Sequence, residues 1–356
     1  MSSSKVRIGI VGLGRIARSH AAGYAQVADV AEVAGFCDID SERAAQFGQE
    51  FGGTAYSSLD DLIDDPQIDA VDLILPHNLH RDAAMAVLRS GKHLLMEKPL
   101  ANTYQESMEI LEAARASGVK FMVAENTRYV SAYVAAEAVL RQGVIGTVNQ
   151  ARTSLISHEK TRLSQPDFWG RSYATGGGLI LDSGTHSFYL LKWLLGEVRD
   201  LVAHARQVLP LASEVEDTAE VIGSLVSGAS FSSSFTSISE SPHNERLELH
   251  GTDGVIIVDL MTDPVIRVYQ FRKPLEVSAL GIDVAAAGSH GWTPGGWHFE
   301  SVVAEVADFV GSIVSNRETL INSADCAYAV KIVEEAYRSI RTGQRVSLSP
   351  QEGVLQ

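Results

Sequence analysis

The chain has 356 residues, of which 45% are hydrophobic and 21% charged, a composition typical of globular proteins and a length that favours two domains. Its formal net charge of −15 would repel a polyanion, which argues against nucleic acid as a partner. Two cysteines, no apolar run of membrane-spanning length and an N-terminus without a leader pattern predict a cytoplasmic protein with no membrane partner.

Strands and helices alternate through the first third of the chain. The strands read as continuous apolar runs, the type that is buried on both faces of a parallel sheet. They are expected at residues 5–11, 31–37, 54–56, 70–75, 92–96 and 119–124. Helices are expected between them, at about 15–27, 41–50, 59–63, 81–90 and 103–117, with Ser41 and either Asn102 or Thr103 as caps. This repeated β-α-β order predicts a parallel, doubly wound sheet with helices on both faces.

After about residue 145 the strands are rich in serine and threonine. They are expected at 148–157, 201–208, 218–225, 230–239 and 246–250, with hairpin turns at VSGAS and HGTDGV. A helix over 185–195 would cover one face of this sheet, and helices over 299–314 and 324–342 would end the chain. We therefore expect an α/β domain over 1–125 and an α+β domain with a large, mostly antiparallel open sheet over 126–356. The C-terminal helices are candidates to pack back on the first domain.

The first predicted strand ends in GLGRIA, a G-x-G-x-x-A pattern that opens a helix. Gly12 would permit the tight turn, Gly14 would let the backbone approach a pyrophosphate, and the small Ala17 would let the helix pack closely on the sheet. The helix N-terminus would offer N–H groups and a positive dipole end to the phosphates. Rather than a plain glycine-rich turn, the pattern predicts a Rossmann domain, with cofactor contacts from Gly12, Leu13, Gly14, Arg15 and Ile16.

Asp38 follows the second strand, 21 positions after Ala17. This is about the spacing of the acid that binds the ribose in such domains. Its carboxylate would accept hydrogen bonds from ribose hydroxyls and repel the 2′-phosphate of NADP. Asp40 adds a second negative charge, so NAD is predicted in preference to NADP. A helix N-terminal acid is the alternative role, and it suits Asp40 or Ser41 better.

Three residues, Pro76, His77 and His80, follow the strand at 70–75. Ligands of open parallel sheets bind at the carboxyl ends of the strands, so these residues are candidates to contact the cofactor. For His80, a helix-start residue bonded to the backbone is an equally good interpretation. A metal site is poorly supported, because no acid or cysteine cluster completes the histidine pair.

Five more polar residues follow the last two strands of this series: Glu97 and Lys98, then Asn126, Arg128 and Tyr129. A lysine held at a strand end could hydrogen-bond a substrate hydroxyl and stabilise negative charge on its oxygen. Taken alone, Glu97 and Lys98 are more simply a surface ion pair at a turn. Asn126, Arg128 and Tyr129 fall at the domain junction, a preferred place for pockets, and Asn126 is a further candidate cofactor contact.

The segment GGGLILDSGTH, residues 176–186, places Asp182 and His186 four positions apart at the start of a predicted helix. Side chains at that spacing can share one face of a helix. They could be a cap, a metal pair or catalytic groups. Ser183 or Thr185 is expected to cap the helix, which explains part of the segment but not the histidine. The glycines are expected to let the backbone approach the substrate and the nicotinamide.

Aromatic and basic residues occur before this segment and again in a later glycine-rich loop. Trp169 and Arg171 precede the glycines, and Trp292, Trp297 and His298 lie in GSHGWTPGGWHFE. Aromatic rings in loops can stack on sugar faces, but they are as often core anchors or subunit contacts. We take Trp169, Arg171 and Trp292 as candidate substrate contacts.

Together these motifs resemble the glucose–fructose oxidoreductase / inositol dehydrogenase (Gfo/Idh/MocA) family. The resemblance rests on GLGRIA, the pair Leu79-His80, EKPLA at 97–101 and GGGLILDSGTH, which occur in the family's order over nearly the whole chain. It implies a Rossmann domain joined to an α/β domain whose open sheet mediates assembly into a dimer or tetramer. It also implies NAD(P)-dependent oxidation or reduction of a carbinol of a sugar, cyclitol or related polyol.

The resemblance also assigns roles to matching positions. Lys98 resembles the lysine near the reacting hydroxyl, and Asp182 and His186 resemble the acid and histidine of the catalytic segment. Asn126 and Arg128 match the polar positions after the sixth strand. Taken together with the candidates from the residues themselves, the predicted substrate contacts are Lys98, Arg128, Tyr129, Trp169, Arg171, Asp182, His186 and Trp292.

Three features depart from the family pattern and bear on the substrate more than on the chemistry. His77 stands where an asparagine is frequent. A glycine separates Trp169 from Arg171, where a Trp-Arg pair is common. The tryptophan-rich loop at 288–298 is not a recognised family signature.

We therefore expect hydride transfer between a secondary alcohol and NAD, with no metal. His186 would be the general base and Lys98 would stabilise alkoxide character on the reacting oxygen. Asp182 would bind a neighbouring hydroxyl, or orient His186 and tune its pKa. Three alternatives stay open: a redox-neutral enzyme that oxidises C3 of a glycoside with tightly held NAD, a non-catalytic NAD-binding regulator, and a zinc enzyme that lacks a convincing third ligand.

Overall fold

The computed structural model describes residues 5–209, 213–284 and 295–348. The chain divides into two compact units. Unit 1 comprises Met1–Tyr129 and Gly291–Ala327, and unit 2 comprises Val130–His290 and Tyr328–Gln356. Across the described ranges, none of the helices has both the length and the apolar character needed to span a membrane.

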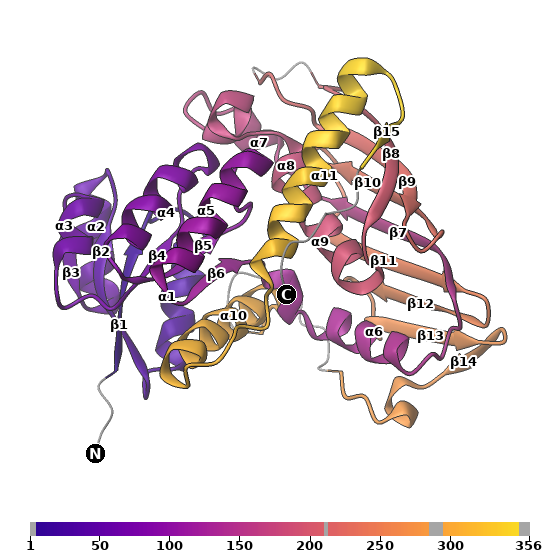
Figure 1. The fold of residues 1–356 in the computed structure, drawn as a ribbon, viewed down its shortest axis with the longest axis horizontal. Coiled ribbons are helices and arrows are strands. Elements are labelled where there is room, and N and C mark those ends of the chain that lie inside the picture. The colour runs from indigo at the N-terminus through magenta and orange to yellow at the C-terminus, as the bar shows by residue number, and fades with distance from the viewer. Residues whose placement is uncertain (1–4, 210–212, 285–294, 349–356) are drawn as a thin grey trace. The chain divides into compact units, whose positions relative to one another are not determined.

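Unit 1 is built on a six-stranded sheet with the order β3-β2-β1-β4-β5-β6 (Figure 1). Every pairing in it is parallel, as the sequence predicted. The strands are β1 (Val6–Val11), β2 (Ala31–Cys37), β3 (Thr54–Tyr56), β4 (Ala70–Leu73), β5 (His93–Glu97) and β6 (Phe121–Ala124). Val71 on β4 and the adjacent pair Leu94 and Leu95 on β5 are fully buried, because helices cover both faces of the sheet.

The helices of unit 1 form two layers, in which α1 packs on α10 and α4 packs on α5. They are α1 (Ala17–Gln26), α2 (Ser41–Phe51), α3 (Leu59–Asp64), α4 (His80–Arg89), α5 (Tyr104–Ser117) and α10 (Trp297–Val314), with short 3₁₀ turns η1 (His77–Leu79) and η2 (Asn126–Tyr129). Thr103, rather than Asn102, caps α5 through a capping box with Glu106. The cap of α2 is Asp40 and not the expected Ser41. The backbone is still extended at Asp40, so its carboxylate can accept hydrogen bonds from two backbone amides in the first turn of the helix.

Helix α10 returns the C-terminal part of the chain to unit 1. On α1, a Cβ added to Gly23 would lie 2.9 Å from Cγ2 of Val306, so the glycine lets the two helices approach closely. The division expected from the sequence, 1–125 and 126–356, placed this segment in the second domain, although the C-terminal helices were candidates to pack back on the first. An apolar helical pattern does not say which sheet the helix will cover, and Gly291–Ala327 belongs to unit 1.

Unit 2 contains a nine-stranded sheet with the order β14-β13-β12-β11-β7-β10-β9-β8-β15 (Figure 1). The strands are β7 (Val148–Ile156), β8 (Val198–Arg206), β9 (Thr218–Leu225), β10 (Ser230–Thr236), β11 (Asn244–Gly251), β12 (Gly254–Asp259), β13 (Ile266–Gln270), β14 (Lys273–Leu275) and β15 (Val346–Ser347). Among the described strand pairs of this second sheet, only β7–β10 is parallel. The expected hairpins at VSGAS and HGTDGV are present as β9–β10 and β11–β12, so the predicted fold class is confirmed.

One face of this sheet carries the helices of unit 2. Helix α9 (Gly184–Leu195) packs on β7 and β10, α8 (Leu179–Asp182) packs on β9 and β10, and α6 (Ser131–Arg141) packs on β12 and β13. The remaining helices are α7 (Lys160–Leu163) and α11 (Ser323–Thr342), with 3₁₀ turns η3 (Trp169–Arg171), η4 (Tyr173–Thr175) and η5 (Val277–Leu280). Val202 and Ile222 pair across β8 and β9 and are exposed. Assembly through this sheet stays a prediction.

Candidate active site

The phosphate loop joins β1 to α1, and its two glycines have different tasks. Gly12 has φ +88°, and a Cβ there would lie 2.1 Å from the carbonyl oxygen of Ile74, so it shapes the contact between the ends of β1 and β4. A Cβ on Gly14 would meet no described atom within 4 Å, and Gly14 is exposed. The helix behind it starts without a side-chain cap from any described residue. An open backbone at an uncapped helix start fits a pyrophosphate.

Asp38 holds this loop in place. One carboxylate oxygen accepts the amide of Leu13 at 2.7 Å and the other accepts the amide of Asp40 at 2.9 Å. Arg43, which the sequence did not single out, lies beside both acids. Its Nη1 is 3.3 Å and 3.4 Å from the two Asp38 oxygens, and its Nη2 is 3.2 Å from Asp40 Oδ2. A carboxylate has about four acceptor positions, so ribose hydroxyls would compete with Arg43 for Asp38. A basic group therefore does lie beside the predicted ribose acid.

Replacing Asp38 with serine should relax the preference for NAD. The change removes the charge that repels a 2′-phosphate and leaves Arg43, 45% of whose side chain is exposed, to pair with that phosphate. We expect the affinity for NADPH relative to NADH to rise roughly 10- to 100-fold, or about 1.4–2.8 kcal/mol. Titration of both cofactors by intrinsic fluorescence measures this ratio. The additional change Arg43→Ala should reverse the gain, and an unchanged ratio in the single variant would show that Asp38 does not select the cofactor.

Two buried histidines, His77 and His80, follow β4. His80 is fully buried, with Nδ1 2.8 Å from Pro99 O and Nε2 2.9 Å from Leu75 O. Burial lowers its pKa, so the ring is neutral at pH 7. A neutral ring has one N–H, so it can donate to only one of these two carbonyl oxygens. The burial and backbone contacts favour the helix-start interpretation, and a cofactor contact by His80 stays a prediction. His77 is buried and packs edge-on against His80, with ring centroids 5.5 Å apart, directly after Pro76.

Lys98 follows the last residue of β5 and is half-buried. Glu97 is only 9% exposed, and its Oε2 accepts the amide of Lys98 at 3.1 Å. Because Glu97 is buried, it is not part of a surface Lys–Glu pair. The carboxylate of Glu97 contacts His20 and the Lys98 amide, and its assignment as a cofactor contact stays a prediction.

Beneath this turn lies a cluster of buried ionisable side chains. Nδ1 of His20 is 2.9 Å from Asp72 Oδ2, and its Nε2 is 3.2 Å from Glu97 Oε1. Tyr24 donates its hydroxyl to the same Asp72 oxygen at 3.0 Å. Burial by itself would lower the pKa of His20, but the charge of Asp72 and the hydrogen bonds to both carboxylates raise that pKa well above its usual value. The imidazole is therefore a cation held between two carboxylates.

Glu305, on α10, belongs to the same region. It is fully buried, and neither carboxylate oxygen has a hydrogen-bond partner among the described residues. Burial raises its pKa well above the usual value, and although the charge of His20 opposes this, nearby Glu97 and Glu125 add to it. Glu305 therefore holds its proton more tightly in the folded protein than in the unfolded chain.

Replacing Glu305 with glutamine should flatten the dependence of stability on pH. Folded Glu305 keeps its proton above about pH 4.5, where the unfolded chain loses it. The folded state then binds more protons, so the free energy of unfolding falls with rising pH, by at most about 1.4 kcal/mol per pH unit from this group. The glutamine variant lacks this loss and should be more stable than the wild type at pH 8. Urea unfolding from pH 5 to 8 tests this, with the exposed Glu300→Gln as control. Parallel curves for wild type and variant would contradict it.

The residues after β6 are tied to α10. Asn126 donates its side-chain amide to Ser301 Oγ at 2.9 Å, and Tyr129 donates its hydroxyl to Asp308 Oδ2 at 2.7 Å. Tyr129 thus anchors α10 through the proton of its hydroxyl, and its role as a substrate contact stays a prediction. Arg128 is half-buried, and its amide donates to Glu125 O.

In unit 2, GGGLILDSGTH forms two consecutive helices rather than a loop and one helix. Asp182 is the last residue of α8, and His186 is the third residue of α9; both are half-buried. The expected caps are absent among these described residues. Ser183 already has helical dihedrals and makes no capping bond, while Thr185 donates to Leu181 O at 3.0 Å. Because α8 runs almost directly into α9, the second helix has no extended residue before it that could serve as a cap.

The glycines of this segment approach the protein itself. A Cβ on Gly177 would lie 2.4 Å from Gly170 O, and one on Gly178, which has φ +124°, would lie 2.3 Å from the hydroxyl of Tyr337. These contacts account for both glycines within the protein, and their close approach to substrate and nicotinamide stays a prediction. They allow the segment to pack against η3 and α11 within unit 2.

A small hollow of about 50 Å³ lies beside these glycines. The structure brings Trp169 and Asp182 together in its lining, whereas Arg171 and His186 are not part of it. Sequence reasoning missed Glu159, Arg162 and Glu216, which also line the hollow. Glu216 accepts the amide of Ile180 and the hydroxyls of Tyr173 and Tyr337, all at 2.8–2.9 Å. The acidic run EVED before β9 was the available signal for it.

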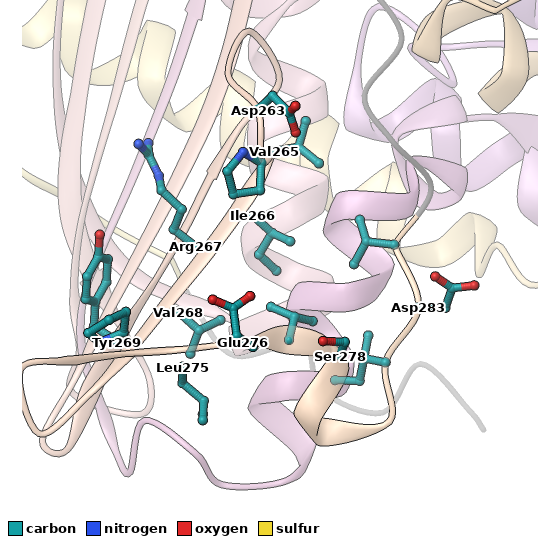
Figure 2. A pocket seen from close by; sticks show the side chains of 15 residues that line it. Asp263, Val265, Ile266, Arg267, Val268, Tyr269, Leu275, Glu276, Ser278 and Asp283 are labelled. Atoms are coloured by element: carbon teal, nitrogen blue, oxygen red, sulfur yellow. The ribbon is translucent and has the colours of Figure 1, made fainter.

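A larger hollow, of about 390 Å³, lies at the other end of the sheet of unit 2 (Figure 2). It is lined by β13, β14 and η5, including Arg267, Tyr269 and Glu276. None of the predicted site residues lines it, and its described lining contains no histidine or lysine. We therefore do not place the chemistry there. Trp292 lies outside the described residues, and within the described ranges no group of three or more His, Cys, Asp or Glu side chains could hold a metal ion.

Comparison with known proteins supports both halves of this arrangement. A family model described as "Oxidoreductase family, NAD-binding Rossmann fold" matches residues 6–125, and the model of the C-terminal domain of the same family matches residues 133–257. The chain belongs to the Gfo/Idh/MocA family of oxidoreductases. The resemblance inferred from the motifs is thus confirmed, and NAD is the cofactor of its Rossmann domain.

Named relatives of this Gfo/Idh/MocA chain include sugar oxidoreductases. A 1,5-anhydro-D-fructose reductase from Ensifer adhaerens is 32% identical over 292 residues, which is 78% of this chain and 84% of the reductase. A levoglucosan dehydrogenase from Pseudarthrobacter phenanthrenivorans is 24% identical over 93% of this chain and 95% of its own. A solved levoglucosan dehydrogenase in complex with NADH has a TM-score of 0.86 at 23% identity, covering 97% of this chain and all of the other, which shows a shared fold.

Proposed function

We propose that this protein transfers a hydride between NAD and a secondary alcohol of a sugar, cyclitol or glycoside. The observation that carries the proposal is Lys98, a cation fixed at the carboxyl end of β5 in the same unit as the phosphate loop and Asp38. In open parallel sheets this edge is where ligands bind. The names of the relatives, a reductase of an anhydro sugar and a dehydrogenase of another, support the substrate class.

The residues of unit 1 would hold the cofactor and one side of the reacting group. Gly12, Leu13, Gly14, Arg15 and Ile16 would receive the pyrophosphate, and Asp38 the ribose hydroxyls. NAD, when bound, supplies the hydride acceptor. Lys98 would hydrogen-bond the reacting oxygen and stabilise the negative charge that grows on it as its proton leaves.

The residues of unit 2 would transfer the hydroxyl proton and bind the remainder of the substrate. His186 would take the hydroxyl proton as general base and return it in the reverse direction. Asp182 would accept a hydrogen bond from a neighbouring hydroxyl, and Trp169, which lines the same small hollow, would stack on an apolar sugar face. A secondary alcohol with adjacent hydroxyls is the substrate class that uses all of these groups.

A substrate panel tests this proposal. Levoglucosan, D-apiose and inositol would be offered with NAD, and 1,5-anhydro-D-fructose with NADH, while NADH absorbance is followed. The cofactor content of the purified protein would be measured after denaturation. Turnover of at least one compound is the expected result. Tightly held NAD with sugar conversion but no accumulating NADH would indicate the redox-neutral cycle, and NADH binding with no conversion of any compound would indicate a regulator.

A further inference from the structure

A continuous chain of hydrogen bonds runs from the helix of the phosphate loop to the backbone of Lys98. His20 lies in the first turn of α1, with Nδ1 2.9 Å from Asp72 on β4 and Nε2 3.2 Å from Glu97 on β5. Glu97 uses its other oxygen to accept the amide of Lys98 at 3.1 Å. Neither dinucleotide binding nor the proposed proton transfer requires these contacts.

Holding α1 on the sheet does not require charged groups. Burying an ion pair costs desolvation energy that the attraction between the charges offsets only when the geometry is good, and an apolar contact of similar volume often holds as well. His20 and Asp72 are nevertheless fully buried, and Tyr24 adds its hydroxyl to Asp72. Oδ1 of Asp72 has no hydrogen-bond partner among the described residues, but Oδ2 binds both His20 and Tyr24. A buried polar network of this kind favours one defined geometry, because few arrangements keep all of its bonds.

The backbone around Lys98 is held on both sides. Before it, the Glu97 carboxylate binds the Lys98 amide and is itself held by His20. After it, the carbonyl of Pro99 lies 2.8 Å from His80 Nδ1. His80 is fully buried, and its Nε2 faces the carbonyl oxygen of Leu75 at 2.9 Å, so the ring has little freedom to move away from Pro99. The turn that carries the lysine thus has two fixed ends.

We propose that His20 is a positioning residue for Lys98, which it holds in place for the reaction through the carboxylate of Glu97. The proposal rests on the role given to Lys98 under the proposed function. His20 touches neither substrate nor reacting atoms in this scheme, so its effect is transmitted by the Glu97 side chain alone.

Two substitutions distinguish the contact made by Nε2 of His20 from the contact made by its Nδ1. The amide of His20→Gln can reach the position of Nε2 and keep the contact with Glu97. The shorter His20→Asn can reach the position of Nδ1 and keep only the contact with Asp72. Tyr24→Phe is the matched control, because it removes a hydrogen bond from the same cluster without touching Glu97. Glu97→Gln is a second probe, because Glu97 accepts from His20 with Oε1 and from the Lys98 amide with Oε2. The NH2 group that replaces one of these oxygens cannot accept, so one of the two contacts is lost.

The readout is the acetylation rate of Lys98 in the protein without added substrate or cofactor, followed against pH by mass spectrometry. The plateau at high pH, where the amine is neutral, reports the exposure and orientation of the side chain independently of its pKa. NADH fluorescence and thermal unfolding establish that each variant is folded. With a sugar from the panel that is turned over, kcat and KM are measured as well.

We expect the plateau to rise about threefold or more in His20→Asn and Glu97→Gln, since the freed turn opens locally, and to stay near wild type in His20→Gln and Tyr24→Phe. In His20→Asn, kcat should fall up to about 100-fold with little change in KM. If His20→Asn does not fold, Glu97→Gln decides. A wild-type plateau in the folded His20→Asn or in Glu97→Gln, or equal plateaus in the two His20 variants, overturns the proposal. The labelling result stands even if no sugar is turned over, so failure of the proposed function is recognised separately.

Discussion

Replacing His186 with alanine is expected to lower kcat by about 10²- to 10⁴-fold, the range typical of a lost general base, while NADH still binds. His186 belongs to α9 of unit 2, whereas the phosphate loop and Asp38 belong to unit 1, so the fold of the cofactor domain should not change. The rate would be measured as NADH formation on a sugar from the panel, and NADH affinity by fluorescence. A loss confined to kcat would identify a group that acts in the transition state.

Two further variants make this result specific. His186→Gln keeps a hydrogen-bonding side chain of similar size but cannot take up a proton near neutral pH, so it should lose nearly as much activity as alanine. His204→Ala removes an exposed histidine from β8 of the same unit and should leave kcat unchanged. Turnover by His186→Ala within a few-fold of wild type would rule out His186 as the base.

Replacing Gly12 with alanine is expected to destabilise the protein by about 2–4 kcal/mol. The added methyl would lie 2.1 Å from the backbone oxygen of Ile74, at a residue with φ +88°, so both the contact and the backbone conformation are unfavourable. A backbone oxygen at the end of β4 cannot turn aside as a flexible side chain could. Urea unfolding with and without NADH measures the loss.

Gly14→Ala is the matched comparison in the same loop. Its methyl meets no described atom within 4 Å, so stability should stay within about 0.5 kcal/mol of wild type. The same methyl would occupy the space through which a pyrophosphate approaches, so NADH affinity should fall roughly tenfold or more. Unaltered NADH binding by this variant would show that the loop does not hold the phosphates, and a stable Gly12→Ala would show that the contact with Ile74 is easily relieved.

The sequence was most informative where structure is determined locally. The parallel strands of unit 1 are apolar runs bounded by glycines and helix caps, and each was placed to within a few residues. In unit 2, β13, β14 and β15 were not identified, because short strands near the ends of an open sheet carry a weaker pattern. His80 fitted two interpretations equally well until its backbone partners were known.

The parts that the sequence could not supply depend on contacts between distant positions. Glu305 sits in an ordinary apolar helix, and only the packing of α10 on α1 places it near His20. The close neighbours of Gly177 and Gly178 are Gly170 and Tyr337, the latter about 160 residues further along the chain. Arg43 was passed over because Asp38 and Asp40 dominated the local charge, although its guanidinium reaches both.

The return of α10 to unit 1 has a consequence for how the chain is made. At a synthesis rate of 5–20 residues per second, the ribosome needs roughly 10–40 s to go from Tyr129 to Ala327. For that interval the nascent α1 lacks the helix that packs along Gly23. The Rossmann unit is therefore finished only after most of unit 2 has been synthesised, so the cofactor domain cannot mature from the N-terminal segment alone.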